Sequence, residues 1–246
     1  MKRDRLIVAL DFTAGAPALA MARALKGLVR TVKVGSALFT ACGPDVVRRL
    51  RMLGFQVMLD LKFFDIPSTV ELSCRAAAGL RVSRLTVHAA GDRRMLEAAV
   101  RGARAGTRRR GASSPKVLAV TVLTSTPAPA TVRRGQRRVG GGQPEVTQRV
   151  IRLARQALEA GCDGVVASAQ EAAPLRRALR RPFELVCPGI RPLPASRGDQ
   201  HRVGTPAEAL ASGADLLVIG RPITGARDPR AAARQLLNEM EDRHAC

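Results

Sequence analysis

The sequence predicts a (β/α)8 barrel, an α/β fold in which eight parallel strands alternate with eight helices. Eight short apolar runs alternate with Ala- and Arg-rich amphipathic stretches, mostly at intervals of about 20–30 residues. The chain has 246 residues, a usual size for such a barrel, so we expect one domain over residues 1–246. No G-x-G-x-x-G motif follows the first apolar run, which disfavours the alternative, a doubly wound open sheet with a dinucleotide site.

The candidate strands are mostly continuous apolar runs rather than alternating apolar and polar residues. Continuous runs are typical of parallel strands that helices cover. In chain order the predicted strands are 6–10, 31–34, 56–60, 84–87, 116–122, 164–167, 184–187 and 216–219.

The candidate helices lie between these runs and carry start and stop signals. Pro44, Pro206 and Pro229 stand where a first helical turn tolerates proline. Glycines follow five of the stretches, as helix C-termini favour: Gly54, Gly79, Gly106, Gly161 and Gly213. The predicted helices are 17–28, 44–53, 68–78, 93–105, 145–160, 170–179, 207–212 and 229–241.

One connection, residues 124–144, is much longer than the others and carries prolines, glycines and a basic cluster. Long segments without a helix or strand pattern are either working loops or disordered. Because this segment follows the fifth strand, it is expected to be a lid over the active site, and the alternative is a basic loop without a function.

The composition narrows the class of protein. Hydrophobic residues make up 46% of the chain, which excludes a disordered composition, and no apolar run is long enough to cross a bilayer. Only five apolar residues separate Arg5 from Asp11, too few for a signal peptide, so a cytoplasmic protein is expected. The five cysteines are an odd number and lack C-x-x-C spacing, which disfavours a disulfide framework or a zinc site.

The net charge of +21 raises the possibility of nucleic-acid binding. Aromatic residues are only 2% of the chain, with no Trp or Tyr, so stacking platforms for single strands are few. A basic, solvated surface is the favoured interpretation, and no specific nucleic-acid partner is expected.

In a barrel of this type, the residues just past the carboxyl ends of the strands build the active site. Most of those positions are polar or charged: Asp11, Lys33, Asp60, Lys62, His88, Thr124, Ser168, Arg191, Gly220 and Arg221. Burying one uncompensated charge is costly, so several at one rim indicate a mutually compensating network.

The most informative run begins at Asp60 and continues through Lys62 to Asp65. On an extended chain Asp60 and Lys62 point to the same side, and Lys33 would lie beside them on the neighbouring strand. Alternating ammonium and carboxylate groups keep the lysines charged and place a proton donor where a carbanion could form. We therefore expect Lys33, Asp60, Lys62 and Asp65 around one rim.

A second group of residues suits phosphate binding. The loops after the seventh and eighth strands are the usual phosphate site of these barrels, and here they carry Arg191, Gly220 and Arg221. A guanidinium can bind a phosphate through two hydrogen bonds. Gln200 could add an amide donor. His88 is interpreted as a support for the barrel end more readily than as a base, and no metal site is expected among three histidines without paired spacing.

These residues resemble the orotidine 5′-phosphate decarboxylase family along essentially the whole chain. The resemblance rests on ALD (9–11), VKVG (32–35), DLKFFDIP (60–67), TVHAAG (86–91), LTS (123–125), PGIRP (188–192), DQ (199–200) and GRP (220–222). It implies a (β/α)8 barrel that decarboxylates orotidine 5′-monophosphate (OMP) to UMP and CO2 in pyrimidine biosynthesis. It also implies that the enzyme uses neither a metal nor an organic cofactor.

The resemblance implies a role for each matching residue. Asp11 and Lys33 would bind the ribose, and Lys33 would also support Asp60. Asp60 would face the substrate carboxylate, and Lys62 would donate the proton to C6. The remaining implied ligands are Thr124 and Ser125 at the pyrimidine, and Gln200, Gly220, Arg221 and Arg191 at the phosphate. Asp65, Ile66 and Thr69 would reach the neighbouring subunit's site in a homodimer.

The chain departs from the family at Asp92, where a glycine is frequent, and in its basic lid. The main rival function is that of the related sugar-phosphate enzymes, such as a keto-gulonate phosphate decarboxylase or a hexulose phosphate synthase. Those enzymes use Mg²⁺ and have an acidic ligand where this chain has Lys33, whose charge would repel the metal.

Overall fold

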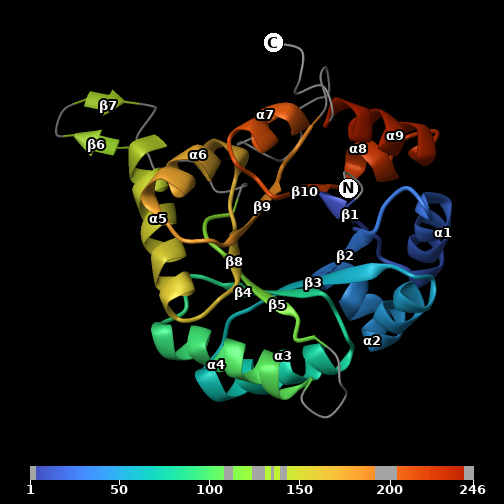
Figure 1. Cartoon of the computed structure of the whole chain (residues 1–246), viewed down its shortest axis with the longest axis horizontal. Coiled ribbons are helices and arrows are strands. Elements are labelled where there is room, and N and C mark those ends of the chain that lie inside the picture. The colour runs from blue at the N-terminus through green and yellow to red at the C-terminus, as the bar shows by residue number, and fades with distance from the viewer. Residues whose placement is uncertain are drawn as a thin grey trace.

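The computed structural model describes residues 4–107, 113–123, 131–133, 136–138, 143–191 and 204–240. It confirms the predicted (β/α)8 barrel. Eight parallel strands close in the order β1-β10-β9-β8-β5-β4-β3-β2, and helices surround them (Figure 1). These strands are β1 Leu6–Ala9, β2 Thr31–Gly35, β3 Gln56–Phe63, β4 Arg84–His88, β5 Lys116–Val120, β8 Gly164–Val166, β9 Glu184–Pro188 and β10 Leu216–Ile219.

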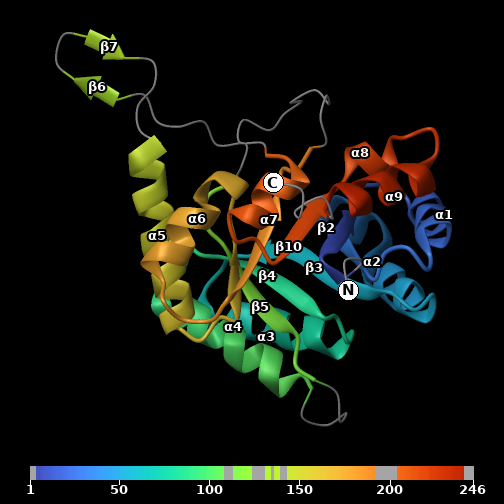
Figure 2. The same cartoon turned by 45° about the horizontal axis from the view of Figure 1, so that its top comes forward.

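The helices form the outer layer. They are α1 Gly15–Leu25, α2 Ser36–Met52, α3 Pro67–Gly79, α4 Arg93–Ala105, α5 Gln143–Glu159, α6 Ala169–Ala178, α7 Pro206–Ala211, α8 Arg221–Thr224 and α9 Pro229–Glu239. Figure 2 shows the same ring after a turn of the molecule. Among the described residues, no helix is long and apolar enough to cross a membrane.

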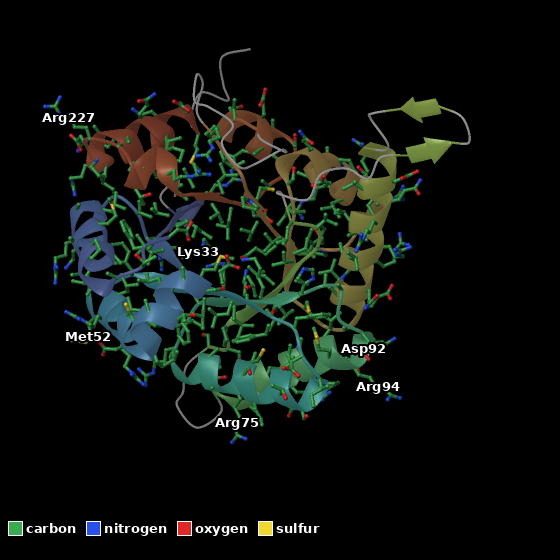
Figure 3. The ribbon with its side chains drawn as sticks, turned by 180° about the vertical axis from the view of Figure 1, so that it is seen from behind. Lys33, Met52, Arg75, Asp92, Arg94 and Arg227 are labelled. Atoms are coloured by element: carbon green, nitrogen blue, oxygen red, sulfur yellow. The ribbon has the colours of Figure 1, made fainter. Side chains whose placement is uncertain are left out.

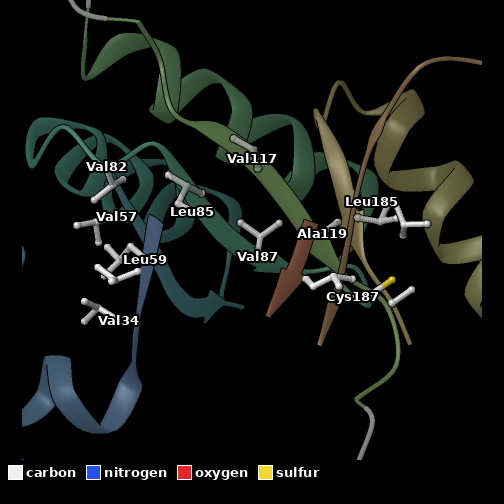
Figure 4. Packing of buried hydrophobic residues seen from close by; sticks show 14 of the residues in the cluster. Val34, Val57, Leu59, Val82, Leu85, Val87, Val117, Ala119, Leu185 and Cys187 are labelled. Atoms are coloured by element: carbon white, nitrogen blue, oxygen red, sulfur yellow. The ribbon is translucent and has the colours of Figure 1, made fainter. Parts of the chain in front are cut away.

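The strands bury both of their faces, which explains their continuous apolar sequences. Val57 and Leu59 on β3 pack outward against the helices with Leu85 and Val87 on β4 (Figure 4). Met58, which lies between Val57 and Leu59, belongs instead to a separate cluster inside the barrel. Successive side chains of a strand point to opposite faces. Alternate residues of one strand therefore pack either against the helices or inside the barrel.

Three helical predictions needed correction. Helix α2 begins at Ser36 rather than at residue 44, and it is interrupted at Gly43, whose φ is 61°. Its first half follows β2 without a turn signal in the sequence. Gly79 and Gly106 do not take the left-handed conformation that often ends a helix: Gly79 is the last residue of α3, and Gly106 has φ −69°. At Gly106 a Cβ would lie 2.5 Å from the Arg75 carbonyl oxygen, so close packing of α3 and α4 requires the glycine.

The long connection 124–144 lies mostly outside the described residues. Its described part contains β6 Thr131–Arg133 and β7 Gln136–Arg138, which pair antiparallel and lie outside the barrel sheet. These strands were not expected from the sequence. Whether the connection acts as a lid stays a prediction.

The amino ends of the strands are joined by ion pairs. Arg84 donates two hydrogen bonds to Glu184, at 2.6 and 3.1 Å, and Lys116 binds the same carboxylate. These charges are paired with one another across three strands. The carboxyl ends of the strands, in contrast, surround a cavity.

Candidate active site

A cavity of about 450 Å³ lies at the carboxyl ends of the barrel strands. Its charged lining consists of Asp11, Lys33, Asp60, Lys62, Arg191 and Arg221. Its apolar floor consists of residues from five strands: Ala9, Met58, Val120, Val166 and Val218. Sequence reasoning did not single out these apolar residues, because nothing distinguishes them from the other strand residues before the barrel closes. Figure 3 shows Lys33 inside the ring, whereas Arg75, Arg94 and Arg227 lie at its periphery.

Lys33, Asp60 and Lys62 form a continuous ion network in this cavity. The Nζ of Lys62 lies 2.9 Å from Oδ2 of Asp60, and the Nζ of Lys33 lies 3.4 Å from the same oxygen. Lys33 also donates to Oδ1 of Asp11, which follows β1, at 2.8 Å. The register places Lys33 opposite Met58 and Gly35 opposite Asp60, so adjacent parallel strands bring these charges together.

The ion network keeps its buried groups charged. Burial by itself would raise the pKa of Asp60, but the charges of Lys33 and Lys62, together with hydrogen bonds from Lys62 and Thr86, outweigh burial and hold that pKa below its usual range. Burial would likewise lower the pKa of Lys33, but Asp60 and Asp11 outweigh it and raise that pKa. At neutral pH the Asp60 carboxyl is therefore ionised and the Lys33 amine is protonated.

The contact between Asp60 and Lys62 does not arise from a regular strand. The pairing of β3 with β4 shifts between Leu59 and Phe63, and Lys62 has φ 50°, a conformation that non-glycine residues rarely adopt. Asp60 and Lys62 therefore point toward each other, as expected, but through an irregular backbone and not through an extended one. Thr86 on β4 is hydrogen-bonded to both residues. Its hydroxyl accepts from the Lys62 amide and donates to Oδ1 of Asp60.

Asp65 does not join this network within one chain. It is exposed, does not line the cavity, and accepts a hydrogen bond from the Ile66 amide at 2.6 Å. Ile66 and Thr69 are exposed as well. The structure thus brings together three of the four charges expected at one rim.

The expected phosphate ligands lie partly in the cavity. Arg191 follows β9, whereas Gly220 and Arg221 follow β10, and all three line the cavity wall. Gly220 lies next to Asp11: a Cβ at Gly220 would be 3.6 Å from Asp11 Oδ2. Gln200, Thr124 and Ser125 are outside the described residues.

His88 lies beside the cavity rather than in its wall. Its Nδ1 accepts a hydrogen bond from the Ala90 amide at 3.3 Å, and its ring lies 5.7 Å from that of Phe64. Burial, with the positive charges of Lys62 and Arg149, lowers its pKa. These contacts agree with a supporting role.

The turn after His88 is formed despite the departure at Asp92. The Asp92 side chain accepts from the Met95 amide at 2.7 Å and caps α4. An aspartate here is favourable because its carboxylate satisfies a free amide at the helix start. Within the described ranges, no group of three or more His, Cys, Asp or Glu side chains could hold a metal ion.

The mouth of this closed parallel barrel carries two lysines, two aspartates and two arginines. These features place the protein among the (β/α)8-barrel enzymes, with a cavity suited to a small anionic ligand. Over residues 4–236 the chain matches the model of the Orotidine 5′-phosphate decarboxylase / HUMPS family. The chain belongs to this family.

Individual relatives agree with the family match. The chain is 48% identical over 236 residues to the orotidine 5′-phosphate decarboxylase of Halorhodospira halophila, covering 96% of this chain and 95% of that protein. It is 49% identical over 233 residues to the enzyme of the same name from Anaeromyxobacter sp., covering 95% and 96%. The crystal structure of the Lactobacillus acidophilus orotidine 5′-phosphate decarboxylase superposes with a TM-score of 0.80 at 37% identity, covering 96% of this chain and 99% of that one.

Proposed function

We infer that this chain decarboxylates OMP to UMP and CO2 in pyrimidine biosynthesis. The observation that carries this inference is the Lys33–Asp60–Lys62 ion network, which lies in the same cavity as Arg191 and Arg221. Such a cavity offers a proton donor, a fixed carboxylate and guanidinium groups that can bind a phosphate. The family match and the named relatives support the same reaction.

Lys62 is the proposed proton donor. When the bond between C6 and the carboxylate breaks, its electron pair stays on C6 and CO2 leaves. The Lys62 ammonium then transfers a proton to C6, and solvent reprotonates the resulting amine. The carbanion is not delocalised into a neighbouring π system, so preorganised positive charge must stabilise it.

Asp60 is proposed to face the substrate carboxylate and to hold the Lys62 ammonium in place. Because Asp60 stays ionised, it also disfavours the bound carboxylate, an effect that disappears when CO2 departs. Lys33 and Asp11, which are joined at 2.8 Å, are proposed to bind the ribose hydroxyls, with Lys33 also supporting Asp60.

Arg221, Gly220 and Arg191 are proposed to bind the 5′-phosphate, with Gln200 as an additional donor. Arg221 is solvent-exposed at the cavity wall, where a guanidinium can form two hydrogen bonds to a phosphate. Binding energy from the phosphate is available to order the site around the reacting carbon. Thr124 and Ser125 are proposed pyrimidine contacts, at the base of the proposed lid 124–144.

We propose that the enzyme is a homodimer with shared active sites. Asp65, Ile66 and Thr69 are exposed on one chain, outside its own cavity. This surface is partly apolar, because Ile66 is 64% exposed and the adjacent Phe64 is 61% exposed. A second copy that covered this surface would receive Asp65 at its own cavity. We also propose that the enzyme acts in the cytoplasm, as a single barrel domain.

The proposed reaction requires neither a metal nor an organic cofactor, because Lys62 supplies the proton and the stabilising charge. The test is a spectrophotometric assay with OMP in EDTA, using wild type and Lys62→Ala. We expect substrate absorbance to fall and UMP to appear with wild type alone. Activity on a sugar phosphate that requires added Mg²⁺, without turnover of OMP, would refute the proposal and support the sugar-phosphate branch of the family.

A further inference from the structure

Thr86 occupies a position that the proposed mechanism does not use. It lies in the middle of β4, is fully buried and does not line the cavity. Its neighbours Leu85 and Val87 point outward into the core between strands and helices. Alternation along the strand therefore turns Thr86 toward the barrel interior, beside Asp60.

The irregular part of β3 lies opposite Thr86. Leu59 pairs with Leu85 and Phe63 pairs with Val87, so three residues of β3 face the single residue Thr86. Lys62, in this stretch, adopts φ 50°. Among the described non-glycine residues, only Arg81 shares such a conformation. A left-handed residue of this kind persists only where its surroundings hold it.

The Thr86 hydroxyl stabilises this conformation through two hydrogen bonds. It accepts a hydrogen bond from the Lys62 amide at 2.9 Å and donates one to Oδ1 of Asp60, also at 2.9 Å. A carboxylate can only accept, so the single hydroxyl proton is directed to Asp60 and a lone pair remains for the Lys62 amide. One side chain therefore connects the main chain of the proposed proton donor with the side chain of its partner.

The two carboxylate oxygens of Asp60 therefore have different partners. Oδ1 is bound by Thr86, whereas Oδ2 faces the ammonium groups of Lys62, at 2.9 Å, and Lys33, at 3.4 Å. Rotation of the carboxylate would break the bond to Thr86. The hydroxyl thus fixes the direction in which Oδ2 points, and with it the place where the Lys62 ammonium rests.

We propose that Thr86 is a positioning residue for the decarboxylation: its hydroxyl sets the place of the Lys62 ammonium by holding the Lys62 main chain and the Asp60 carboxylate together. This inference rests on the proposed function of the site. Thr86 acts through Asp60 and Lys62 and does not itself contact the substrate.

The test compares Thr86→Val, which keeps the shape and removes the hydroxyl, with Thr86→Ser, which keeps the hydroxyl. Thr121→Val is the matched control, because Thr121 is also buried near the barrel mouth but its hydroxyl donates to the Val166 carbonyl, at 3.0 Å, instead of to Asp60. For Thr86→Val we expect kcat to fall by about 10- to 100-fold, because misplacing a reacting group by about 1 Å can cost that much. Affinity for UMP should change little, and Thr86→Ser and Thr121→Val should keep kcat within about threefold of wild type.

Wild-type kcat in Thr86→Val, or an equal loss in Thr121→Val, would overturn the proposal. So would a loss of kcat in Thr86→Val that Thr86→Ser does not restore. Melting temperatures identify variants that fail to fold, and Thr86→Ala then replaces Thr86→Val in the same comparison.

A second measurement does not depend on activity. The carboxyl carbon of Asp60 is followed by NMR during a pH titration of wild type and Thr86→Val. The charged groups around Asp60, which are Lys33 from β2, Lys62 from β3 and Asp11 after β1, are the same in both proteins. A higher pKa of Asp60 in Thr86→Val is expected, since a hydrogen bond to its ionised form is lost.

An unchanged pKa of Asp60 in Thr86→Val would refute the proposal that the Thr86 hydroxyl positions the Asp60 carboxylate. If wild type did not turn over OMP, the proposed function would fail, and the titration would still decide whether Thr86 holds Asp60.

Discussion

Lys62 and Asp60 are bound to each other by a 2.9 Å ion pair although the strand that carries both is irregular between them. The Asp60 carboxyl is almost buried, with 10% of its side chain exposed, whereas the Lys62 side chain is 34% exposed. The ammonium can therefore reach a bound molecule while its partner stays fixed in the barrel. This relationship leads to predictions about catalysis, assembly and stability.

Replacing Lys62 by alanine should remove the proton donor and leave the binding groups in place. We expect kcat for OMP to fall by at least about 100-fold, the usual contribution of a positioned general acid. Affinity for UMP, measured by calorimetry, should stay close to that of wild type. Lys26→Ala, at an exposed lysine after α1, is the control. Turnover by Lys62→Ala at the wild-type rate would show that another group donates the proton.

Replacing Arg221 by alanine should weaken the binding of phosphorylated ligands. A charge-assisted hydrogen bond contributes about 1.5–3 kcal/mol, so KM for OMP and Kd for UMP should rise roughly 10- to 100-fold. The affinity for uridine, which lacks the phosphate, should not change. Arg227→Ala removes an exposed arginine of the same segment, and it should behave as wild type. Equal losses for UMP and uridine would contradict the phosphate assignment.

Mixing two inactive variants should restore activity if the active sites are shared. Lys62→Ala lacks the proton donor, and Asp65→Ala lacks the residue that we assign to the neighbouring site. In a mixed dimer both substitutions fall in one site and the other is intact, so an equal mixture should recover about a quarter of wild-type activity. The activity is measured before and after subunit exchange, with exchange verified by mass spectrometry. No gain after complete exchange would argue against shared sites.

The stability of the protein should depend on pH through Asp60. Its pKa is lowered in the folded state, so its contribution is present above the ordinary value of 3.8 and is lost as pH falls through the folded value. Lys33 behaves oppositely: its contribution is present below 10.5 and is lost as pH rises through the raised folded value. Stability from this pair is therefore largest between those limits.

Asp60→Asn should expose this dependence. The variant removes the carboxylate bound to Lys62 and leaves buried Lys33 with Asp11 as its carboxylate partner, so the free energy of unfolding near neutral pH should be lower by about 3 kcal/mol. The loss of stability between about pH 6 and about pH 3, measured by urea unfolding, should also be smaller than in wild type. Asp45→Asn, at an exposed carboxylate on α2, should leave the acid dependence unchanged. An acid dependence in Asp60→Asn as steep as in wild type would contradict the assignment.

The contact between α3 and α4, which lie side by side in Figures 1 and 2, should be sensitive to one methyl group. A Cβ at Gly102 on α4 would lie 2.1 Å from the Glu71 carbonyl oxygen on α3. Gly102→Ala should lower the free energy of unfolding by about 1–3 kcal/mol through overpacking. Gly79→Ala is the control, because among the described residues, apart from its chain neighbours and the adjacent backbone of its own helix, no atom lies within 4 Å of a Cβ at that position. Equal stability of the two variants would contradict the packing argument.

Much of the fold could be predicted because its signals are local. The eight barrel strands appear as apolar runs, and β10 begins and ends at the predicted residues. The first half of α2 was missed because residues 36–42 carry no cap or turn signal after β2. Gly106 ends α4 as predicted, but the reason for a glycine there is the close approach of α3, which depends on Arg75, a residue distant in sequence.

The sequence by itself determined the barrel, the residue types at the carboxyl ends of its strands and the meeting of Lys33 with Asp60 on adjacent strands. These follow from apolar patterning and from the parallel order of the strands, which are properties of the chain read locally. Only the tertiary structure decided that Lys62 reaches Asp60 from a left-handed backbone. Only the tertiary structure showed that Thr86 binds both residues and that Asp65 lies outside its own cavity. The physical reason is that these features depend on how β3 pairs with β4 and closes the barrel, which brings together groups that no local pattern relates.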